Sequence, residues 1–378
     1  MKRLLALLLC LLLCLTLLPA AAAEDIEIAE PAEATPPPDE PNVSHSGECG
    51  KNLRWRLDFL YGDSNSWHKF FRLVISGSGD MWDYNNGSAP WYDPISDEQV
   101  KELVIEDGAT SIGEQAFSCC EYLTSATIGS GVEDIGAMAF YGCTRLESLT
   151  IPDCVEDIGY CAFYYCFSLR EIVFEGSAPR FLDEEIFYND VLVAYYPAGD
   201  ASWTDSVRQN YDGFVLWASD DGPRLTLSTY ADDALEDTHF RGGGTVSGGE
   251  GTFTLSERNN RPTLVAVKES GQYTALKCTT SGGTHSFTLN ITSNAELALV
   301  LKGDTNLDGE VTNRDATLCK QALMGTVVNG SRVVFTDPLQ QMAADRDGDG
   351  QLKSREATFI SQVVAGTVVN GKVCVYDW

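Results

Sequence analysis

Residues 111–128 read SIGEQAFSCCEYLTSATI, residues 134–151 read DIGAMAFYGCTRLESLTI, and residues 157–174 read DIGYCAFYYCFSLREIVF. Each copy has Ile-Gly, Ala-Phe and Cys at the same places, and the copies begin 23 residues apart. A constant period in this range is typical of a solenoid, in which each unit covers the apolar face of the next. These residues therefore predict a stack of short, similar units.

The repeat also predicts the local structure of each unit. The segments LTSATI, LESLTI and LREIVF alternate apolar and polar residues, which suits a short strand in a stacked parallel sheet. The Gly after each Ile suits a sharp turn, and we expect the Ala-Phe pair to begin a short helical turn whose Phe fills the interior. The segment VKELVIEDGATSIG at 100–113 is in phase with the copies, so roughly three and a half units are visible.

Three cysteines occupy one position of the repeat, namely Cys120, Cys143 and Cys166. Identical positions in stacked units imply a column of buried thiols. A column of metal ligands is the alternative interpretation. Disulfides between repeats, or between Cys154 and Cys161, also stay open, because an exported chain permits them.

The repeat resembles the leucine-rich repeats of the BspA-like family, which have the same Ile-Gly, Ala-Phe, Gly-Cys and Leu-x-x-x-x-Ile pattern. The flanking segments CGKNLRWRL, LVISGSGDMWDY and VAYYPAGDASWTDSVRQNYDGFVLW are similar to the caps of that family. The resemblance implies an N-terminal β cap over 48–100, a leucine-rich-repeat β-solenoid over 101–178 and a C-terminal cap over 179–220.

The first 47 residues have the composition of an export signal followed by a linker. In residues 1–23 the basic Lys2 and Arg3 precede an apolar run that ends in small residues, as in a secretory signal peptide. Residues 24–47 are acidic and Pro-rich, which predicts an extended linker. No later segment is apolar for long enough to span a membrane, so we expect a secreted, extracellular protein that takes part in a cell-surface complex.

The chain is strongly acidic, with 26 basic and 55 acidic residues and a formal net charge of −29. This charge makes nucleic acid and anionic membranes poor partners. The acidic residues are most crowded in two C-terminal loops, and a local crowd of carboxylates favours a cation as ligand. The segment between the repeats and these loops, residues 221–302, has short runs of period-two alternation separated by Gly, Asn or Asp, which predicts a small all-β sandwich module.

The two acidic loops follow the twelve-residue calcium pattern, in which hard oxygens surround a large cation and a central Gly allows a sharp turn. Gly309 and Gly350 hold that central position. Glu310 and Gln351 would each offer a backbone carbonyl, and the other ligands would be side chains. The predicted ligands for two Ca²⁺ ions are Asp304, Asn306, Asp308, Glu310, Thr312 and Asp315 in the first loop, and Asp345, Asp347, Asp349, Gln351 and Glu356 in the second.

A strand-like segment precedes the first loop, so the entering helix of a calcium sensor is missing, while a helical segment follows each loop. A loop with one helix, in duplicate, resembles the type I dockerin of cellulosomal proteins, which implies an all-α calcium-binding module over 303–378 and a cohesin of a scaffold protein as partner. Dockerins typically have Asp at the twelfth position; Asp315 agrees and Glu356 departs, as does Lys353 at the ninth. The residues that this resemblance implies for cohesin binding are Asn313, Arg314, Lys320 and Gln321, and Ser354, Arg355, Ser361 and Gln362.

The sequence shows no nucleophile elbow, zinc motif or phosphate loop, so we expect no catalytic residues. The leading hypothesis is a secreted, non-catalytic protein that docks on a cohesin and presents its repeat surface to an unknown protein or glycan, during polysaccharide breakdown or adhesion. One alternative is a free adhesin whose calcium loops only stabilise the C-terminus. A second is a polysaccharide-degrading enzyme.

Several aromatic residues lie in the predicted caps and allow two interpretations. They could form a sugar-binding platform, or they could pack inside the caps, which is the interpretation we favour. The residues concerned are Trp82, Tyr84, Trp91, Tyr195 and Tyr196.

Overall fold

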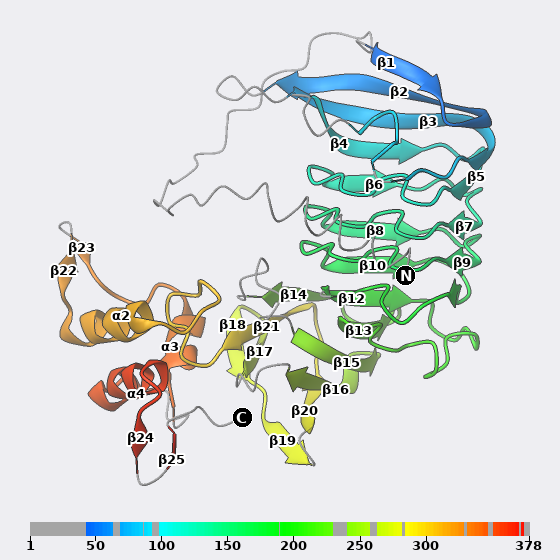
Figure 1. Ribbon diagram of the computed structural model, residues 1–378. Helices are drawn as coiled ribbons and strands as arrows, with labels where there is room; N and C mark the ends of the chain where they lie inside the picture. Colours follow the sequence, from blue (N-terminus) through cyan, green and yellow to red (C-terminus); the bar gives the residue numbers. More distant parts are fainter. Residues whose placement is uncertain are drawn as a thin grey trace. The chain divides into compact units, whose positions relative to one another are not determined.

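The computed structural model describes residues 43–62, 69–85, 87–92, 98–188, 190–229, 240–257, 263–281, 284–328, 331–346, 351–369 and 372–373 (Figure 1). The expected signal peptide and most of the expected linker lie outside these residues. Among the described helices, none combines the length and the apolar composition that crossing a bilayer requires.

The N-terminal segment forms three strands that lead into the repeats. They are β1 (Val43–Glu48), β2 (Gly50–Gly62) and β3 (Lys69–Met81). Strand β3 pairs antiparallel with β2 and parallel with β4 (Glu98–Ile105). The indole of Trp91 is buried under this segment, stacks on Phe117 with ring centroids 5.6 Å apart, and donates to the carbonyl of Ala116. The cap therefore closes the open end of the repeat interior.

Each repeat contributes one longer and one shorter strand to two parallel ladders (Figure 1). Residues 23 apart lie opposite each other, as Ser125 and Ser148 do, which confirms the predicted parallel sheet. The longer ladder runs through β4, β6 (Ser125–Thr127), β8 (Ser148–Ile151), β10 (Glu171–Phe174), β12 (Val191–Tyr196) and β13 (Phe214–Ser219). The shorter ladder runs through β5 (Ala109–Ile112), β7 (Asp134–Ile135), β9 (Asp157–Ile158) and β11 (Arg180–Phe181).

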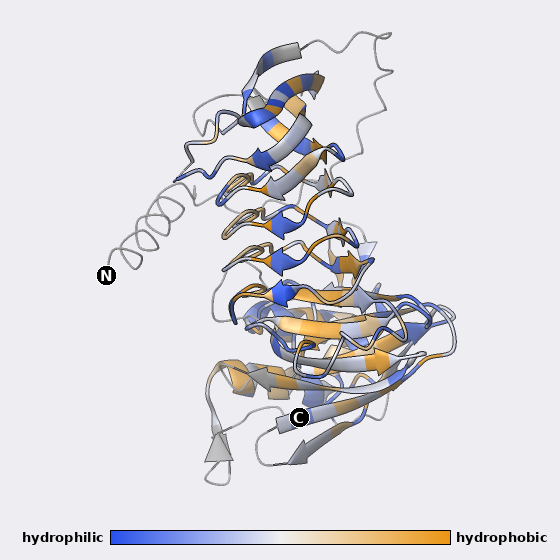
Figure 2. Cartoon of the chain, turned by 90° about the vertical axis from the view of Figure 1, so that its right-hand side faces the viewer, coloured by the Kyte–Doolittle hydropathy of each residue, from blue (hydrophilic) through white to orange (hydrophobic). Residues whose placement is uncertain are grey.

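The repeat interior is a column of aromatic rings beside a column of thiols. Phe117, Phe140 and Phe163 follow one another with ring centroids 5.4 and 5.6 Å apart, and each is at most 1% exposed. The thiol of Cys143 donates to the carbonyl of Phe117 at 3.2 Å, and that of Cys166 donates to the carbonyl of Phe140 at the same distance. The described cysteines carry no disulfide. The prediction of stacked, buried thiols is confirmed. In Figure 2, hydrophobic segments accordingly recur from unit to unit.

The Ala-Phe pairs lie in tight hydrogen-bonded turns, which do not extend into helices. The amide of Ala116 donates to the carbonyl of Gly113 at 3.2 Å, and in the next copy the amide of Ala139 donates to the carbonyl of Gly136 at 3.3 Å. Two positions of each turn have positive φ. The first is held by Gln115, Met138 and Cys161, with φ between 51° and 56°, and the second by Cys119, Gly142 and Tyr165, with φ between 59° and 69°. The turn thus imposes a left-handed backbone on residues other than glycine.

The segment after the repeats is an all-β sandwich, as predicted, but one of its sheets continues the repeat sheet. Strand β13 pairs parallel with β15 (Phe240–Ser247), which leads to β16 (Glu250–Glu257), β20 (Thr284–Asn290) and β19 (Cys278–Ser281). The second sheet has the order β14 (Leu225–Thr229), β21 (Ala295–Leu301), β17 (Thr263–Glu269) and β18 (Gln272–Ala275). Tyr195 and Leu216 from the repeat side pack with Leu297 and Val265 in the shared core.

The C-terminal segment contains the helices α2 (Asn313–Met324), α3 (Pro338–Ala344) and α4 (Ser354–Val364). Helix α2 ends at Gly325 and α4 ends just before Gly366, and both glycines have φ of 60°. Two-residue strands follow each of these helices and form the small hairpins β22 (Val327–Val328) with β23 (Ser331–Arg332) and β24 (Val368–Val369) with β25 (Lys372–Val373). The expected all-α module therefore also carries two small hairpins.

Candidate calcium and docking site

The first acidic loop closes on the side chains at its two ends. It begins directly after β21, and the carboxylate of Asp304 accepts from the amide of Asp308 at 3.2 Å and from that of Gly309 at 2.9 Å. At the other end, Asp315 accepts from the amide of Thr305 at 2.7 Å and from that of Thr312 at 2.8 Å. Positions 1 and 12 of the loop are thus held to its backbone with their carboxylates turned inward.

The electrostatics of this loop call for a cation. Asp304 and Asp315 are both fully buried, and no ion pair to a lysine or arginine is found for them in the described part of the chain. The pKa of Asp304 is raised to about 7, chiefly by burial and also by the carboxylates of Asp315 and Asp308, against hydrogen bonds from the Gly309 and Leu307 amides that lower it. Buried like charges of this kind are stable when a metal ion neutralises them, and an all-oxygen donor set suits Ca²⁺.

The remaining predicted ligands of the first loop take part in hydrogen bonds within the loop or with the start of α2. The side-chain nitrogen of Asn306 donates to one carboxylate oxygen of Asp308 at 2.6 Å, and the backbone amide of Glu310 donates to the other at 3.1 Å. Thr312 is the N-cap of α2, and its hydroxyl accepts from the amide of Arg314 at 3.1 Å. The loop therefore also fixes the start of α2.

The second loop is described only at its two ends. Asp345 follows α3, and Gln351 and Glu356 are described, while Asp347 and Asp349 lie outside the described residues. Glu356 is fully buried, accepts from the amide of Lys353 at 2.9 Å, and pairs with the guanidinium of Arg355 at 2.8 Å. The N-cap residue of α4 is Lys353, which makes no side-chain capping hydrogen bond, whereas Thr312 at the equivalent position caps α2. Sequence reasoning missed the Arg355–Glu356 ion pair, because neighbours in a helix do not usually face each other.

Helices α2 and α4 pack against each other and bring the predicted cohesin-binding residues of the two halves together. Their shared core includes Cys319 and Ile360, both fully buried. The ammonium of Lys320 donates to the hydroxyl of Ser361 at 3.3 Å, so equivalent positions of the two halves meet. Asn313, Arg314, Lys320, Ser354 and Arg355 are exposed, and Gln321, Ser361 and Gln362 are half-buried.

Sequence reasoning also missed the role of α3. Its Leu339 and Ala343 are fully buried, and they pack on the outer face of the β14–β21–β17–β18 sheet. The segments TLVAVKE and ELALVLKG have unbroken apolar runs, and these could have indicated the contact. A strand that is apolar on both faces is usually covered on both faces.

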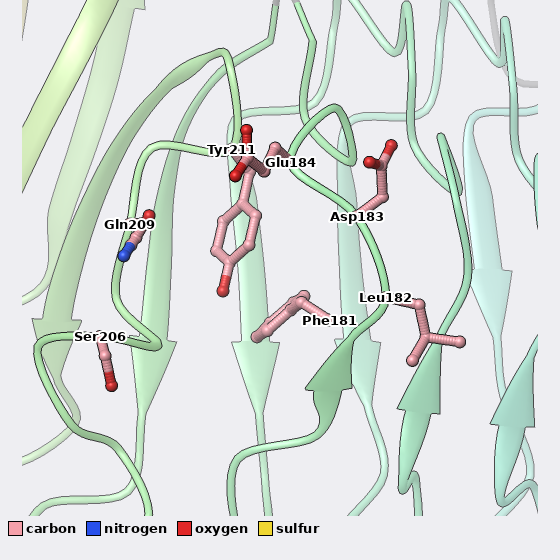
Figure 3. A pocket seen from close by; sticks show the side chains of 7 residues that line it. All are labelled: Phe181, Leu182, Asp183, Glu184, Ser206, Gln209 and Tyr211. Carbon is pink, nitrogen blue, oxygen red and sulfur yellow. The ribbon is translucent and has the colours of Figure 1, made fainter.

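The cap aromatics are mostly interior, as we favoured. Tyr84, Trp91, Tyr195 and Tyr196 are buried, and only Trp82, of these five, is exposed, at 48%. A different pair of rings lines an open, polar depression on the closing cap, where Phe181 and Tyr211 lie with centroids 4.6 Å apart beside acidic side chains (Figure 3). The residues lining it are Phe181, Leu182, Asp183, Glu184, Ser206, Gln209 and Tyr211.

Comparisons with known proteins identify two regions of the chain. The family model described as "BspA type Leucine rich repeat region" matches residues 96–195 in six copies, and that described as "Dockerin type I domain" matches residues 302–364. No curated protein matches the chain.

Three solved structures are similar to parts of the chain. A leucine-rich repeat protein from Eubacterium ventriosum ATCC 27560 is 24% identical over 40% of this chain and 44% of its own, with a TM-score of 0.28. The T. pallidum leucine-rich repeat protein is 16% identical over 38% and 70%, with a TM-score of 0.23. A leucine-rich cell surface protein from Faecalibacterium prausnitzii A2-165 is 16% identical over 54% and 59%, with a TM-score of 0.26. The chain thus spans less than half of the first of these proteins.

Proposed function

The chain carries a BspA-type leucine-rich-repeat region and a type I dockerin domain, and from this premise we propose that it is a secreted binding protein that docks on a cohesin of a scaffold or cell surface. Both modules are non-catalytic in general, and dockerins in general bind calcium and cohesins. The observation that carries the proposal is the first loop, where the buried carboxylates of Asp304 and Asp315 accept hydrogen bonds from backbone amides of the loop just before α2.

Calcium would act here as a folding ligand. The six buried residues of the α2–α4 core form a small cluster, and a module with so little core gains stability from a bound metal. Two ions are proposed. The first is held by the loop from Asp304 to Asp315, and the second by the loop from Asp345 to Glu356 with Asp347, Asp349 and Gln351.

The cohesin-binding surface would be formed by the exposed sides of α2 and α4. Arg314 is the most suitable residue for testing this surface. Its side chain is exposed, and its contact with the first loop is a hydrogen bond from its backbone amide to Thr312. Arg355 is a less clean choice, since its guanidinium contacts the proposed ligand Glu356.

A pull-down with a panel of cohesins tests this surface. We expect capture in calcium and none in chelator, and we expect Arg314→Ala to weaken capture without changing the melting temperature in calcium. Arg54→Ala is the control: Arg54 is also exposed, and it lies on β2, outside the dockerin region. Undiminished capture by the Arg314→Ala chain would argue against this surface.

The second candidate is a free adhesin in which the calcium loops only stabilise the C-terminus. The observation that favours it is the burial of α3 against the sandwich, which would anchor such a stabilising element. A chain that melts higher in calcium and is captured by no cohesin would support this alternative.

The repeat region would present the ligand-binding surface in either case. Its longer strands expose Ser125, Thr127, Ser148 and Thr150, and the depression with Phe181 and Tyr211 adds an aromatic surface with oxygen-bearing neighbours. Such a surface suits a protein or a glycan, in a complex that serves adhesion or polysaccharide breakdown outside the cell. Screening the full chain on glycan and protein arrays, with Tyr211→Ala as a comparison, tests the depression directly.

A further inference from the structure

The outer face of one sandwich sheet is covered by a helix of the dockerin region. This face consists of Leu264 and Ala266 on β17 and Ala298 and Val300 on β21, of which the last three are fully buried. Leu339 and Ala343 of α3 cover it and are themselves fully buried. Tyr273, Leu307 and Met342 pack around the edge of this contact. We call these four sheet residues the outer sheet face.

Helix α3 is also hydrogen-bonded to the first calcium loop. The amide of Gly303 donates to the carbonyl of Ala343 at 2.8 Å, and the side chain of Gln340 donates to the carbonyl of Thr305 at 2.9 Å. Thr305 in turn donates from its amide to the carboxylate of Asp315 at 2.7 Å. A short chain of contacts therefore leads from the outer sheet face through α3 to the residue at the last position of the loop.

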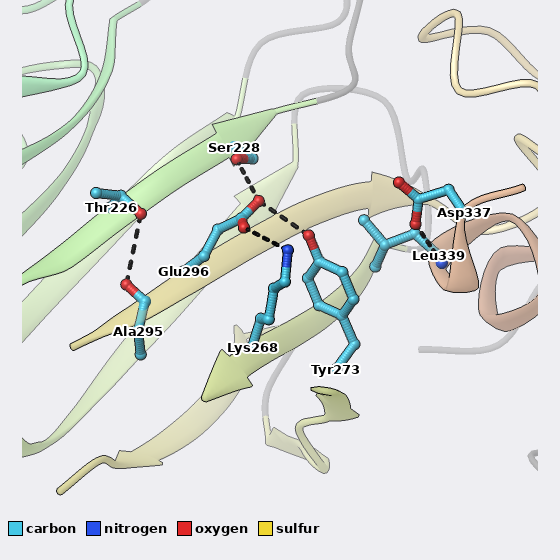
Figure 4. A network of polar contacts seen from close by, with 8 residues as sticks. All are labelled: Thr226, Ser228, Lys268, Tyr273, Ala295, Glu296, Asp337 and Leu339. Atoms are coloured by element: carbon cyan, nitrogen blue, oxygen red, sulfur yellow. Dashed lines mark hydrogen bonds and ion pairs between the residues drawn. The ribbon is translucent and has the colours of Figure 1, made fainter. Parts of the chain in front are cut away.

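The start of α3 and the edge of the sheet are both fixed by hydrogen bonds. Asp337 caps the helix by accepting from the amide of Leu339 at 2.8 Å. On the sheet, Glu296 accepts from Ser228 at 2.6 Å and from the hydroxyl of Tyr273 at 2.9 Å, which holds the Tyr273 ring at the edge of the contact (Figure 4). The helix thus lies on a surface whose side chains have little freedom.

We propose that the sandwich module is a working part of the docking module: its outer sheet face supports α3 and thereby holds the first loop in the shape that binds calcium. This inference rests on the proposed function, since it takes the loop to be a calcium site. The physical reason is preorganisation. A loop already held in its bound shape loses less conformational entropy when the ion binds, so its affinity is higher.

The support is also needed because the helix cannot bury its own apolar side. Helix α3 has seven residues, and helices of this length are marginal in water without tertiary contacts. Strand β21 ends at Leu301, so only Lys302 and Gly303 separate the sheet from the first ligand, Asp304. So short a connection holds the loop beside the sheet, and the hydrogen bond from Gly303 to Ala343 joins α3 to this connection.

The test measures calcium affinity in the full chain, after chelator treatment, by isothermal titration. Ala298→Glu places a carboxylate on the outer sheet face beneath α3, and we expect calcium affinity to fall by about tenfold or more, which corresponds to 1.4 kcal/mol. The control is Thr274→Glu, which also adds a carboxylate to the same sheet but at an exposed position of β18 opposite Val267 of the inner core, on the other face; it should bind calcium as the unchanged chain does.

A milder sheet variant and a helix variant complete the test. Val300→Thr keeps the shape of the side chain and adds a hydroxyl to the outer sheet face, so it decides the question if Ala298→Glu does not fold. Leu339→Ala removes the contact from the helix side. Weakened binding in the sheet variants and in Leu339→Ala supports the proposal. Unchanged affinity in the folded sheet variants overturns it, even if Leu339→Ala binds less calcium, because α3 would then act without the sandwich.

Cohesin capture separates this inference from the proposed function. A chain that binds calcium through a supported loop but is captured by no cohesin leaves the inference intact and removes the docking role. Amide hydrogen exchange gives an independent readout, since faster exchange at Thr305 and Gly309 in Ala298→Glu, compared with Thr274→Glu, is expected only if the sheet holds the loop.

Discussion

The second left-handed position of the repeat turn offers a measurement of backbone strain within one molecule. Cys119, Gly142 and Tyr165 occupy equivalent places with φ of 59°, 69° and 63°, yet only one of them is glycine. A left-handed backbone costs an L-residue roughly 1–2 kcal/mol, and glycine loses roughly 0.5–1 kcal/mol more chain entropy on folding than alanine does. Glycine should therefore be favoured over alanine here by about 1 kcal/mol.

Gly142→Ala isolates this strain from steric overlap. The nearest atom to an added Cβ at Gly142 is the sulfur of Cys119 at 3.6 Å, which is an ordinary contact distance. We expect Gly142→Ala to lower the free energy of unfolding by about 1 kcal/mol in urea titrations of the full chain. The companion comparison is at residue 119, where Cys119→Gly should be more stable than Cys119→Ala by a similar amount. An alanine at residue 142 that is as stable as glycine would refute the reasoning.

Three further results are expected. Phe140→Ala should lower the free energy of unfolding by about 3–5 kcal/mol in urea titrations, because its ring is fully buried between two others. In chelator, the melting temperature should fall as pH rises from about 4 to 7. The reason is the raised pKa of Asp304: in this pH range the folded chain still holds a proton that the unfolded chain has released. Calcium should reverse this trend, and a melting temperature that does not change with pH in chelator would contradict the prediction. Cys120 should resist thiol reagents until the chain unfolds, since burial raises its pKa to about 12, and rapid labelling of the folded chain would contradict this.

The repeat could be predicted in detail because one pattern recurs three times. The interior places of Phe117, Phe140 and Phe163 follow from a shared sequence position, and stacking leaves each such residue one environment. The left-handed turn positions could not be predicted in the same way. Met138 and Tyr165 adopt a conformation that their side chains disfavour, so local preference indicated nothing unusual there and the stack imposes it.

The contacts between modules could not be predicted from sequence patterns. Period-two alternation predicted the strands of the sandwich, but it does not specify which strand of the repeats β15 would join. The burial of Leu339 likewise depends on a surface more than 30 residues away in the chain, on β17 and β21. The first loop was more predictable, because its ligands lie within twelve residues and the backbone geometry of the loop alone brings Asp304 and Asp315 together.

Docking is tested most directly by measuring how cohesin binding by the full chain depends on free calcium. A cohesin from the capturing panel would be titrated at a series of buffered calcium concentrations, alongside the melting temperature of the chain under the same conditions. We predict that cohesin affinity rises with calcium over the range in which calcium raises the melting temperature, and that it vanishes in chelator. Equal cohesin binding with and without calcium, or stabilisation by calcium with no cohesin bound at any concentration, would contradict the docking role.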